Sequence, residues 1–165
     1  MLFGRADEEL HALENAGIEV EVVPGITTAL AAAAAAKQPL TKRGAARSVA
    51  FFTSSTTPGS SEYAAMPDAD TLVQYMGGSD VIVTAQRLLA LGRSADTPVV
   101  VIESCSAPSQ RIFRLTLATL VHGLAPVRGP VLVMLGQAMQ QRVKQVVDRL
   151  DTEPPMTLPV AAPTL

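Results

Sequence analysis

The sequence predicts an α/β fold, in which strands alternate with helices along the chain. Short runs rich in Val, Ile and Leu recur through the 165 residues and have the length of buried strands. Between them lie stretches with helical spacing of apolar residues, several of which end at a glycine. Apolar residues make up 48% of the chain and aromatic residues only 4%, so the core has to be built from Val, Leu, Ile and Ala.

The first part of the chain predicts two helices around one strand. Asp7, Glu8 and Glu9 lie in the first turn of an expected helix, where negative charge favours the helix dipole, and Gly17 is suited to its C-terminal cap. Pro24-Gly25 ends the strand that follows, and the second helix is rich in alanine, the best helix former. The expected elements are a helix at 7–16, a strand at 18–23, a helix at 26–36 and a loop at 38–44.

The remainder predicts five strands and three helices. Residues 98–103 form a nearly continuous Val/Ile run, which is typical of a strand buried on both faces. Ser79 is expected to cap a helix that ends before Gly92. The expected strands are 48–53, 71–76, 98–103, 110–115 and 130–135, the expected helices are 79–91, 116–123 and 137–150, and 54–70 is expected to be an exposed loop.

A domain boundary is expected between residues 38 and 48. It divides the chain into residues 1–44, the end of one α/β lobe, and residues 45–150, a second α/β lobe of ordinary domain size. Residues 151–165 hold four prolines and no apolar period, so we expect a flexible tail there.

Composition argues against several classes of function. The net charge is −2 with no basic block, which disfavours a nucleic-acid partner. No apolar run approaches the roughly 20 residues that span a bilayer, and the N-terminal residues lack the pattern of a secretory signal. Cys105 is the only cysteine, so an internal disulfide is impossible. We expect a soluble cytoplasmic protein without membrane contact.

Four short segments occur in an informative order. They are Leu2-Phe3-Gly4-Arg5, Val22-Val23-Pro24-Gly25-Ile26-Thr27-Thr28, Pro39-Leu40-Thr41-Lys42-Arg43-Gly44 and Leu72-Val73-Gln74-Tyr75-Met76-Gly77. In this order and at these spacings the chain resembles the tetrapyrrole methylases, over about residues 2–150. The resemblance is strongest to the branch that methylates uroporphyrinogen III. It implies a two-lobed α/β fold with the ligands between the lobes, and a mixed sheet flanked by helices in the second lobe.

The resemblance also implies an activity and a site. The methyl donor would be S-adenosylmethionine (SAM), and the substrates would be uroporphyrinogen III and precorrin-1, converted to precorrin-2 in siroheme or cobalamin biosynthesis. The implied cofactor contacts are Leu2, Thr27, Thr28, Met76 and Cys105, and the implied substrate contacts are Lys42 and Arg43. The sulfonium of SAM is already activated, so no metal is expected. No catalytic residue is identified, and a homodimer is implied.

The residues themselves leave other readings open. Without the resemblance, the turn before Thr28 is more typical of an ordinary strand-to-helix connection, and Lys42-Arg43 of a solvated basic loop. Met76 and Tyr75 at a strand end are more often core residues than ligand contacts. Cys105 stands where the family has glycine, so a side chain there is unfavourable if the backbone needs a positive φ or a close contact with SAM.

The resemblance begins at Leu2, whereas the family has a long stretch before this point. We therefore expect a truncated first lobe, and a chain that by itself is not a competent methyltransferase. The alternative is a non-catalytic remnant or dimerisation module of the same fold. The measurement that separates the two hypotheses is binding of SAM.

Overall fold

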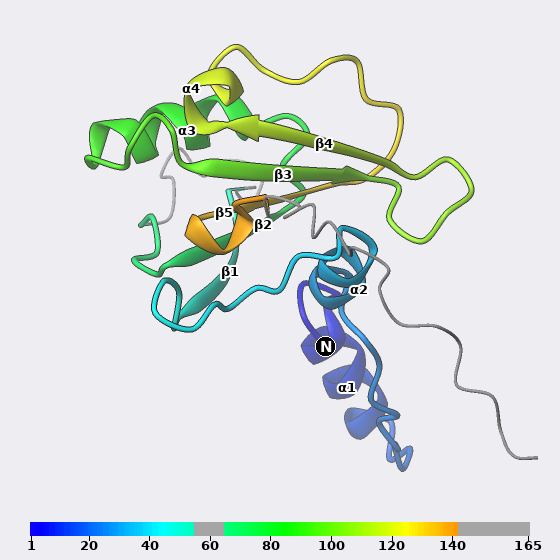
Figure 1. Cartoon of the computed structure of the whole chain (residues 1–165). Coiled ribbons are helices and arrows are strands. Elements are labelled where there is room, and N and C mark those ends of the chain that lie inside the picture. Colours follow the sequence, from blue (N-terminus) through cyan, green and yellow to red (C-terminus); the bar gives the residue numbers. More distant parts are fainter. Residues whose placement is uncertain (55–64, 142–165) are drawn as a thin grey trace, which may run out of the picture.

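A five-stranded mixed sheet forms the centre of the computed structural model, which describes residues 1–54 and 65–141 (Figure 1). The strand order across the sheet is β1-β2-β5-β3-β4. The strands are β1 (Val49–Thr53), β2 (Thr71–Tyr75), β3 (Pro98–Glu103), β4 (Arg111–Thr116) and β5 (Val131–Leu135). The predicted α/β class and mixed sheet are therefore confirmed, and each of these strands overlaps its predicted range.

The pairing of the strands decides which ends lie together. β1 and β2 are parallel, whereas β5 runs antiparallel to both of its neighbours, β2 and β3, and β4 runs antiparallel to β3. Consequently the last residues of β2 and of β3 lie at the same edge of the sheet as the first residues of β5. This edge is where the candidate site is found.

The two faces of the sheet carry two separate cores, because successive side chains of a strand point to opposite faces. In β3, Val99 and Val101 belong to one core, and Val100 and Ile102 belong to the other. All four are buried, which confirms the prediction that this strand is covered on both faces.

Helices α3 (Val81–Ala90) and α4 (Leu117–Leu120) lie over the first face, and α2 (Thr28–Ala35) lies against the other (Figure 1). The buried residues of α2 are Ala29 and Ala32, whose small side chains let the helix lie close to the sheet. The 3₁₀ turn Gln137–Met139 contributes Ala138 and Met139 to the same core as α2. Thus the second face is covered partly from the N-terminal part of the chain and partly from the C-terminal part.

Helix caps differ partly from the prediction. The N-cap of α3 is Asp80 rather than Ser79, and it makes no side-chain capping hydrogen bond. Gly92 follows α3 with a φ of 86°, which suits the predicted C-terminal position. Helix α4 is shorter than predicted, and Thr116 caps it by accepting a hydrogen bond from the Thr119 amide.

The predicted strand at 18–23 is wrong. These residues form no strand in the structure, and Val22 and Val23 are 48% and 81% exposed. The reason is that a strand needs a neighbouring strand for its hydrogen bonds, and none of the described strands pairs with this segment. Helix α1 (Ala6–Asn15), which precedes it, forms close to the predicted bounds but has no buried residue.

The predicted helix at 137–150 is not seen in its described residues, which form only the 3₁₀ turn Gln137–Met139 and then turn to a ψ of 126° at Gln140. Its residues from 142 on lie outside the described part of the chain. The predicted tail at 151–165 and most of the predicted loop at 54–70 also lie outside it. Across residues 1–54 and 65–141, no helix is long and apolar enough to cross a membrane. The cytoplasmic location stays a prediction.

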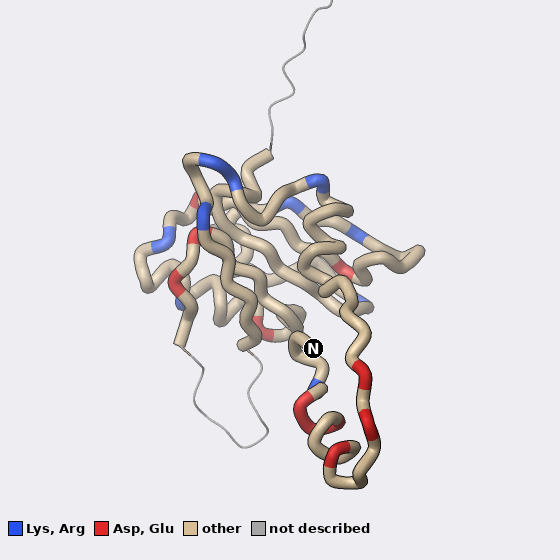
Figure 2. Tube along the Cα trace, turned by 90° about the horizontal axis from the view of Figure 1, so that it is seen from below, with Lys and Arg blue, Asp and Glu red and all other residues tan. Residues whose placement is uncertain are grey.

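Charge is distributed unevenly along the described chain. Acidic side chains gather on α1 and on the segment that follows it, whereas most Lys and Arg side chains lie around the sheet (Figure 2). His11 and His122 are both exposed.

Candidate functional site

A cleft of about 640 Å³ opens at the edge of the sheet where β2 and β3 end and β5 begins. Four parts of the chain supply its walls: the start of α2, the residues after β2, the residues after β3, and the residues that lead into β5. The lining residues are Thr28, Tyr75, Met76, Gly78, Ser79, Ile102, Ser104, Cys105, Ala107, Gly129, Pro130, Val131 and Leu132.

The backbone at the ends of the two strands takes an uncommon conformation. Met76 has a φ of 56° and Ser104 a φ of 49°, both in the left-handed region that residues other than glycine rarely occupy. Such conformations cost on the order of 1–3 kcal/mol each and cluster at functional sites. At Met76 the turn leaves the side chain 51% exposed at the cleft, although the first four residues of β2 are buried.

Cys105 does not itself have the positive φ that a glycine would relieve. The positive values belong to its neighbours, Ser104 and Ser106, the latter at 67°. The Cys105 thiol is half-buried and lies 3.7 Å from the Ser106 hydroxyl. A side chain at Cys105 is therefore not disfavoured by its φ angle, and a close contact of this backbone with SAM stays a prediction.

Gly129 makes room for the turn that holds Cys105. A Cβ at Gly129 would lie 2.0 Å from the Ser104 hydroxyl oxygen. The Ser104 amide also donates to the Pro130 carbonyl, at 2.8 Å. The turn after β3 and the segment before β5 are thus packed directly against each other at the cleft.

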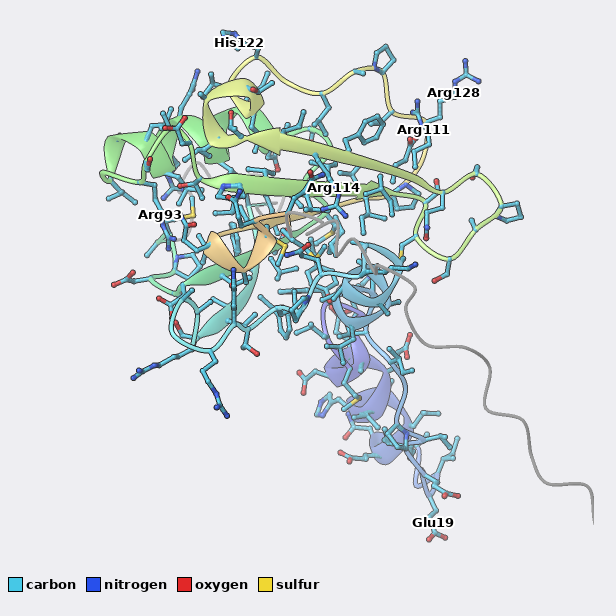
Figure 3. All side chains as sticks on the ribbon, in the orientation of Figure 1. Glu19, Arg93, Arg111, Arg114, His122 and Arg128 are labelled. Carbon is cyan, nitrogen blue, oxygen red and sulfur yellow. The ribbon has the colours of Figure 1, made fainter. Side chains whose placement is uncertain are left out.

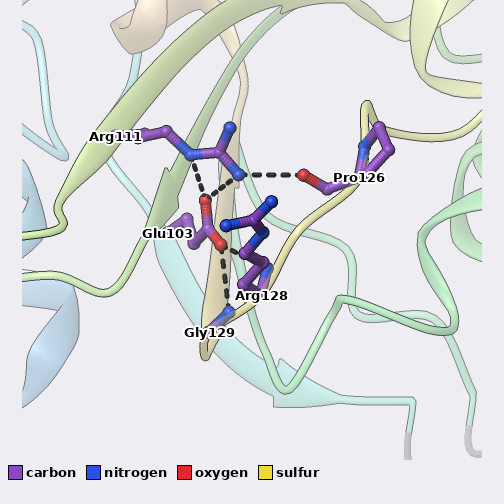
Figure 4. Close-up of polar contacts among 5 residues, drawn as sticks. All are labelled: Glu103, Arg111, Pro126, Arg128 and Gly129. Carbon is purple, nitrogen blue, oxygen red and sulfur yellow. Dashed lines mark hydrogen bonds and ion pairs between the residues drawn. The ribbon is translucent and has the colours of Figure 1, made fainter.

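The buried carboxylate of Glu103 holds the segment before β5 in place through hydrogen bonds (Figure 4). Glu103 is 2% exposed, and it accepts hydrogen bonds from the Arg111 side chain and from the amides of Arg128 and Gly129. The Arg111 guanidinium, followed by the Arg128 amide, lowers the pKa of Glu103 to about 2. The carboxylate therefore stays ionised at neutral pH and fixes the segment that leads into Pro130.

The structure brings together three of the predicted cofactor residues. Thr28, Met76 and Cys105 line the same cleft, although they are far apart in the sequence. Thr27 lies beside it, with its hydroxyl 2.5 Å from the Tyr75 hydroxyl. Leu2 is 41% exposed and is not among the lining residues. The roles of all five as cofactor contacts stay predictions.

Lys42 and Arg43 do not line the cleft. Both are exposed, on a turn in which the backbone of Lys42 pairs with that of Ala46. The reading as a solvated basic loop therefore agrees with their position, and their predicted contact with substrate needs a ligand that extends beyond the cleft.

The described cleft lining contains no Lys, Arg, His, Asp or Glu residue. It consists of hydroxyl, thiol, thioether, aromatic, small and aliphatic groups, so it offers apolar walls and main-chain polar groups to a ligand. The labelled charged residues of Figure 3 belong elsewhere: Arg114 donates to the Ala36 carbonyl at the end of α2, and Arg93 donates to the Ala69 carbonyl.

Sequence reasoning missed the part of the wall that precedes β5. Gly129-Pro130 gave a weak signal as a turn before a strand, but nothing local indicated that this turn meets the ends of β2 and β3. That juxtaposition follows from β5 lying between β2 and β3, which is a property of the sheet order.

Comparison with known proteins decides the family. The family of Tetrapyrrole (Corrin/Porphyrin) Methylases matches residues 1–121. The chain belongs to the tetrapyrrole methylase family. This confirms the resemblance drawn from the four short segments.

Two relatives by sequence are siroheme synthases. The siroheme synthase of Stutzerimonas stutzeri is 43% identical over 150 residues, which is 87% of this chain and 32% of the relative. Siroheme synthase 3 of Aeromonas hydrophila is 43% identical over 141 residues, which is 84% of this chain and 30% of the relative. The chain therefore spans about a third of the length of these tetrapyrrole methylase relatives.

A solved structure agrees with the fold. The uroporphyrin-III C-methyl transferase from Thermus thermophilus, complexed with S-adenyl homocysteine, superposes with a TM-score of 0.73 at 36% identity. The match covers 85% of this chain and 60% of the Thermus chain. The arrangement of strands and helices described above is therefore the one found in that part of a family member.

Proposed function

We propose that this chain is the part of a SAM-dependent methyltransferase that binds the cofactor, and that the reaction methylates uroporphyrinogen III to precorrin-2 through precorrin-1. The relatives named as siroheme synthase and uroporphyrin-III C-methyl transferase support the reaction, and the S-adenyl homocysteine of the Thermus complex supports the cofactor.

One observation carries the proposal. Thr28, Met76 and Cys105, which the family resemblance assigns to the cofactor, line one cleft although they come from three separate segments. The volume of about 640 Å³ lies within the roughly 300–1,000 Å³ typical of small-molecule sites. The apolar, uncharged lining suits an adenosine and a thioether, and the main-chain groups at the strand ends can supply polar contacts.

In this reaction the main role of the protein is to position the two reacting groups. The cofactor, when bound, supplies an activated methyl group on its sulfonium. The role of this chain is to hold that group in line with a nucleophilic pyrrole carbon, which lowers the entropic cost that free reactants would face. The flexible thioether of Met76 can pack against the ligand, and the turn at Cys105 would shape the opposite wall.

We further propose the two-lobed arrangement, with residues 1–44 in the first lobe and 45–150 in the second, and a homodimer. The support for the first lobe is that α1 and the extended residues after it lie outside the sheet and bury little surface. Val23 and Ile26 are 81% and 80% exposed, so this part of the chain offers apolar surface to a further lobe or subunit.

Lys42 and Arg43 are proposed as contacts for substrate carboxylates beyond the cleft, because arginine pairs with carboxylate in a bidentate manner. If so, Arg43→Ala weakens the binding of uroporphyrinogen III and leaves the affinity for S-adenosylhomocysteine unchanged. Equal losses of both would place Arg43 in a general structural role.

The test of the proposal is calorimetric titration of the 165-residue chain with S-adenosylhomocysteine. We expect binding, and we expect Met76→Ala to weaken it by about tenfold because an apolar wall of the cleft is lost. Leu91→Ala is the matched control, since Leu91 is exposed at the end of α3 and lies outside the cleft lining. Absence of binding by the unmodified chain would contradict the proposal and favour the non-catalytic module.

A further inference from the structure

Tyr75 connects two walls of the cleft that the sequence separates by more than forty residues. It is the last residue of β2, so its backbone leads directly into the left-handed turn at Met76. Its side chain reaches the start of α2, where the hydroxyl lies 2.5 Å from the Thr27 hydroxyl and accepts a hydrogen bond from the Ala29 amide, at 3.1 Å.

The Tyr75 hydroxyl acts as the cap that α2 does not supply itself. Thr27 is the N-cap residue of α2, but its side chain makes no capping hydrogen bond to the helix. Ala29 is the second residue of the helix, and its amide is one of those that a helix leaves without an internal partner. Because Tyr75 accepts from Ala29, its own proton is available to the Thr27 hydroxyl.

The packing of α2 does not by itself determine where the helix starts. Its buried residues are the alanines Ala29 and Ala32, and contacts between methyl groups have little directional preference. Directional contacts occur at its two ends. Arg114 donates to the Ala36 carbonyl at the C-terminal end, and Tyr75 supplies the contact at the N-terminal end, next to Thr28.

The ring of Tyr75 is held in turn by two aromatic neighbours. Its centroid lies 5.1 Å from that of Phe3 and 6.2 Å from that of Phe51, the latter in an edge-on arrangement. These separations are typical of favourable aromatic pairs. The hydroxyl therefore projects from a ring whose position is already restricted.

We propose that Tyr75 is a positioning residue, whose hydroxyl sets the distance between Thr28 and Met76 across the cleft and thereby the affinity for the cofactor. The part that concerns affinity rests on the proposed function. The part that concerns geometry does not, because it can be measured without a ligand. Tyr75→Phe is the informative change, since it removes the hydroxyl and keeps the ring.

The matched control is Thr116→Ala. Thr116 caps α4 through the Thr119 amide, at 3.3 Å, and it does not line the cleft, so its loss removes a helix cap of the same kind elsewhere. Both variants should lower the melting temperature by a similar amount, because each loses one helix cap. A purely structural role for Tyr75 would leave the affinity for S-adenosylhomocysteine unchanged in both variants.

The first measurement is methyl NMR of the ligand-free chain. Tyr75→Phe should shift the methyl resonances of both Thr28 and Met76, and Thr116→Ala should leave both in place. The second is calorimetric titration with S-adenosylhomocysteine, in which Tyr75→Phe should weaken binding by about five- to tenfold through lost preorganisation, and Thr116→Ala should not.

The outcomes separate the inference from the function on which it builds. If the unmodified chain binds and Tyr75→Phe binds equally well, the inference is overturned and the proposed function stands. If the methyl resonances of Thr28 and Met76 do not move in Tyr75→Phe, the geometric part is overturned whatever the titration shows. If the unmodified chain does not bind, the proposed function fails and the role in affinity fails with it.

Discussion

Glu103 and Arg111 lie directly opposite each other on β3 and β4, and the carboxylate of the first is 2.5 Å from the guanidinium of the second. The same carboxylate holds the amides of Arg128 and Gly129, so one buried charge connects the β3–β4 pair to the segment that enters β5. This segment forms a wall of the cleft, which makes the cluster a support for the site as well as for the sheet.

The first prediction concerns pH. The pKa of Glu103 is about 2 in the folded chain against an ordinary value of 4.5, so its stabilising contribution is complete above pH 4.5 and is lost as the pH falls toward 2. Urea unfolding between pH 6 and 2 should show a steeper fall in the free energy of unfolding for the unmodified chain than for Glu103→Gln. Parallel curves for the two proteins would contradict this.

The second prediction concerns Gly136, which follows β5 with a φ of 133°. A Cβ there would lie 2.2 Å from the carbonyl oxygen of Asp70, a main-chain atom that cannot rotate away. We expect Gly136→Ala to lower the free energy of unfolding by about 3 kcal/mol or more. The measurement is urea unfolding followed by circular dichroism.

Gly92→Ala provides the control for that experiment. Gly92 also has a positive φ, 86°, but a Cβ there would meet nothing within 4 Å. Only the conformational term remains, so a loss of about 1 kcal/mol is expected. Similar losses for the two variants would show that the contact with Asp70 is not what requires glycine at position 136.

The third prediction concerns Gln38, which is buried after α2 and donates through its amide nitrogen to the carbonyls of Ala138 and Gln140. Gln38→Met leaves two carbonyls without this donor and should cost about 1–3 kcal/mol. Gln38→Glu should cost more at neutral pH, because a carboxylate would face the two carbonyl oxygens.

Gln86→Met is the matched control for Gln38, since Gln86 is exposed on α3. It should leave the free energy of unfolding within about 0.5 kcal/mol of the unmodified chain. If Gln38→Met were equally neutral, the link between the end of α2 and the residues after β5 would contribute nothing to stability.

The fourth prediction concerns the turn that holds Cys105. Ser104 and Ser106 have φ values of 49° and 67°, whereas Cys105 does not have a positive φ, so the conformational strain lies at the two serines rather than at Cys105. Ser104→Gly should therefore be neutral or stabilise by up to about 1 kcal/mol, and Cys105→Gly should destabilise by a similar amount because it adds flexibility to the unfolded chain. A thermal unfolding series of both variants measures this. The opposite order would place the strain at Cys105.

The sequence by itself determined the features whose causes are local. The Val/Ile run of β3 indicates burial on both faces, because no polar residue interrupts it before Glu103. The acidic first turn and Gly17 indicate the helix α1, and Gly92 indicates the end of α3. The four short segments also indicated the family, since a motif consists of residue types at set spacings and needs no coordinates.

Only the tertiary structure decided the features that depend on partners distant in the sequence. Residues 18–23 have the composition of a strand but form none, because pairing requires a neighbour that composition does not reveal. The left-handed turn at Ser104 depends on its contact with the segment before β5, and the cap of α2 comes from Tyr75 rather than from a residue of the helix. The cleft itself exists because β5 lies between β2 and β3, and strand order is a property of the whole folded chain.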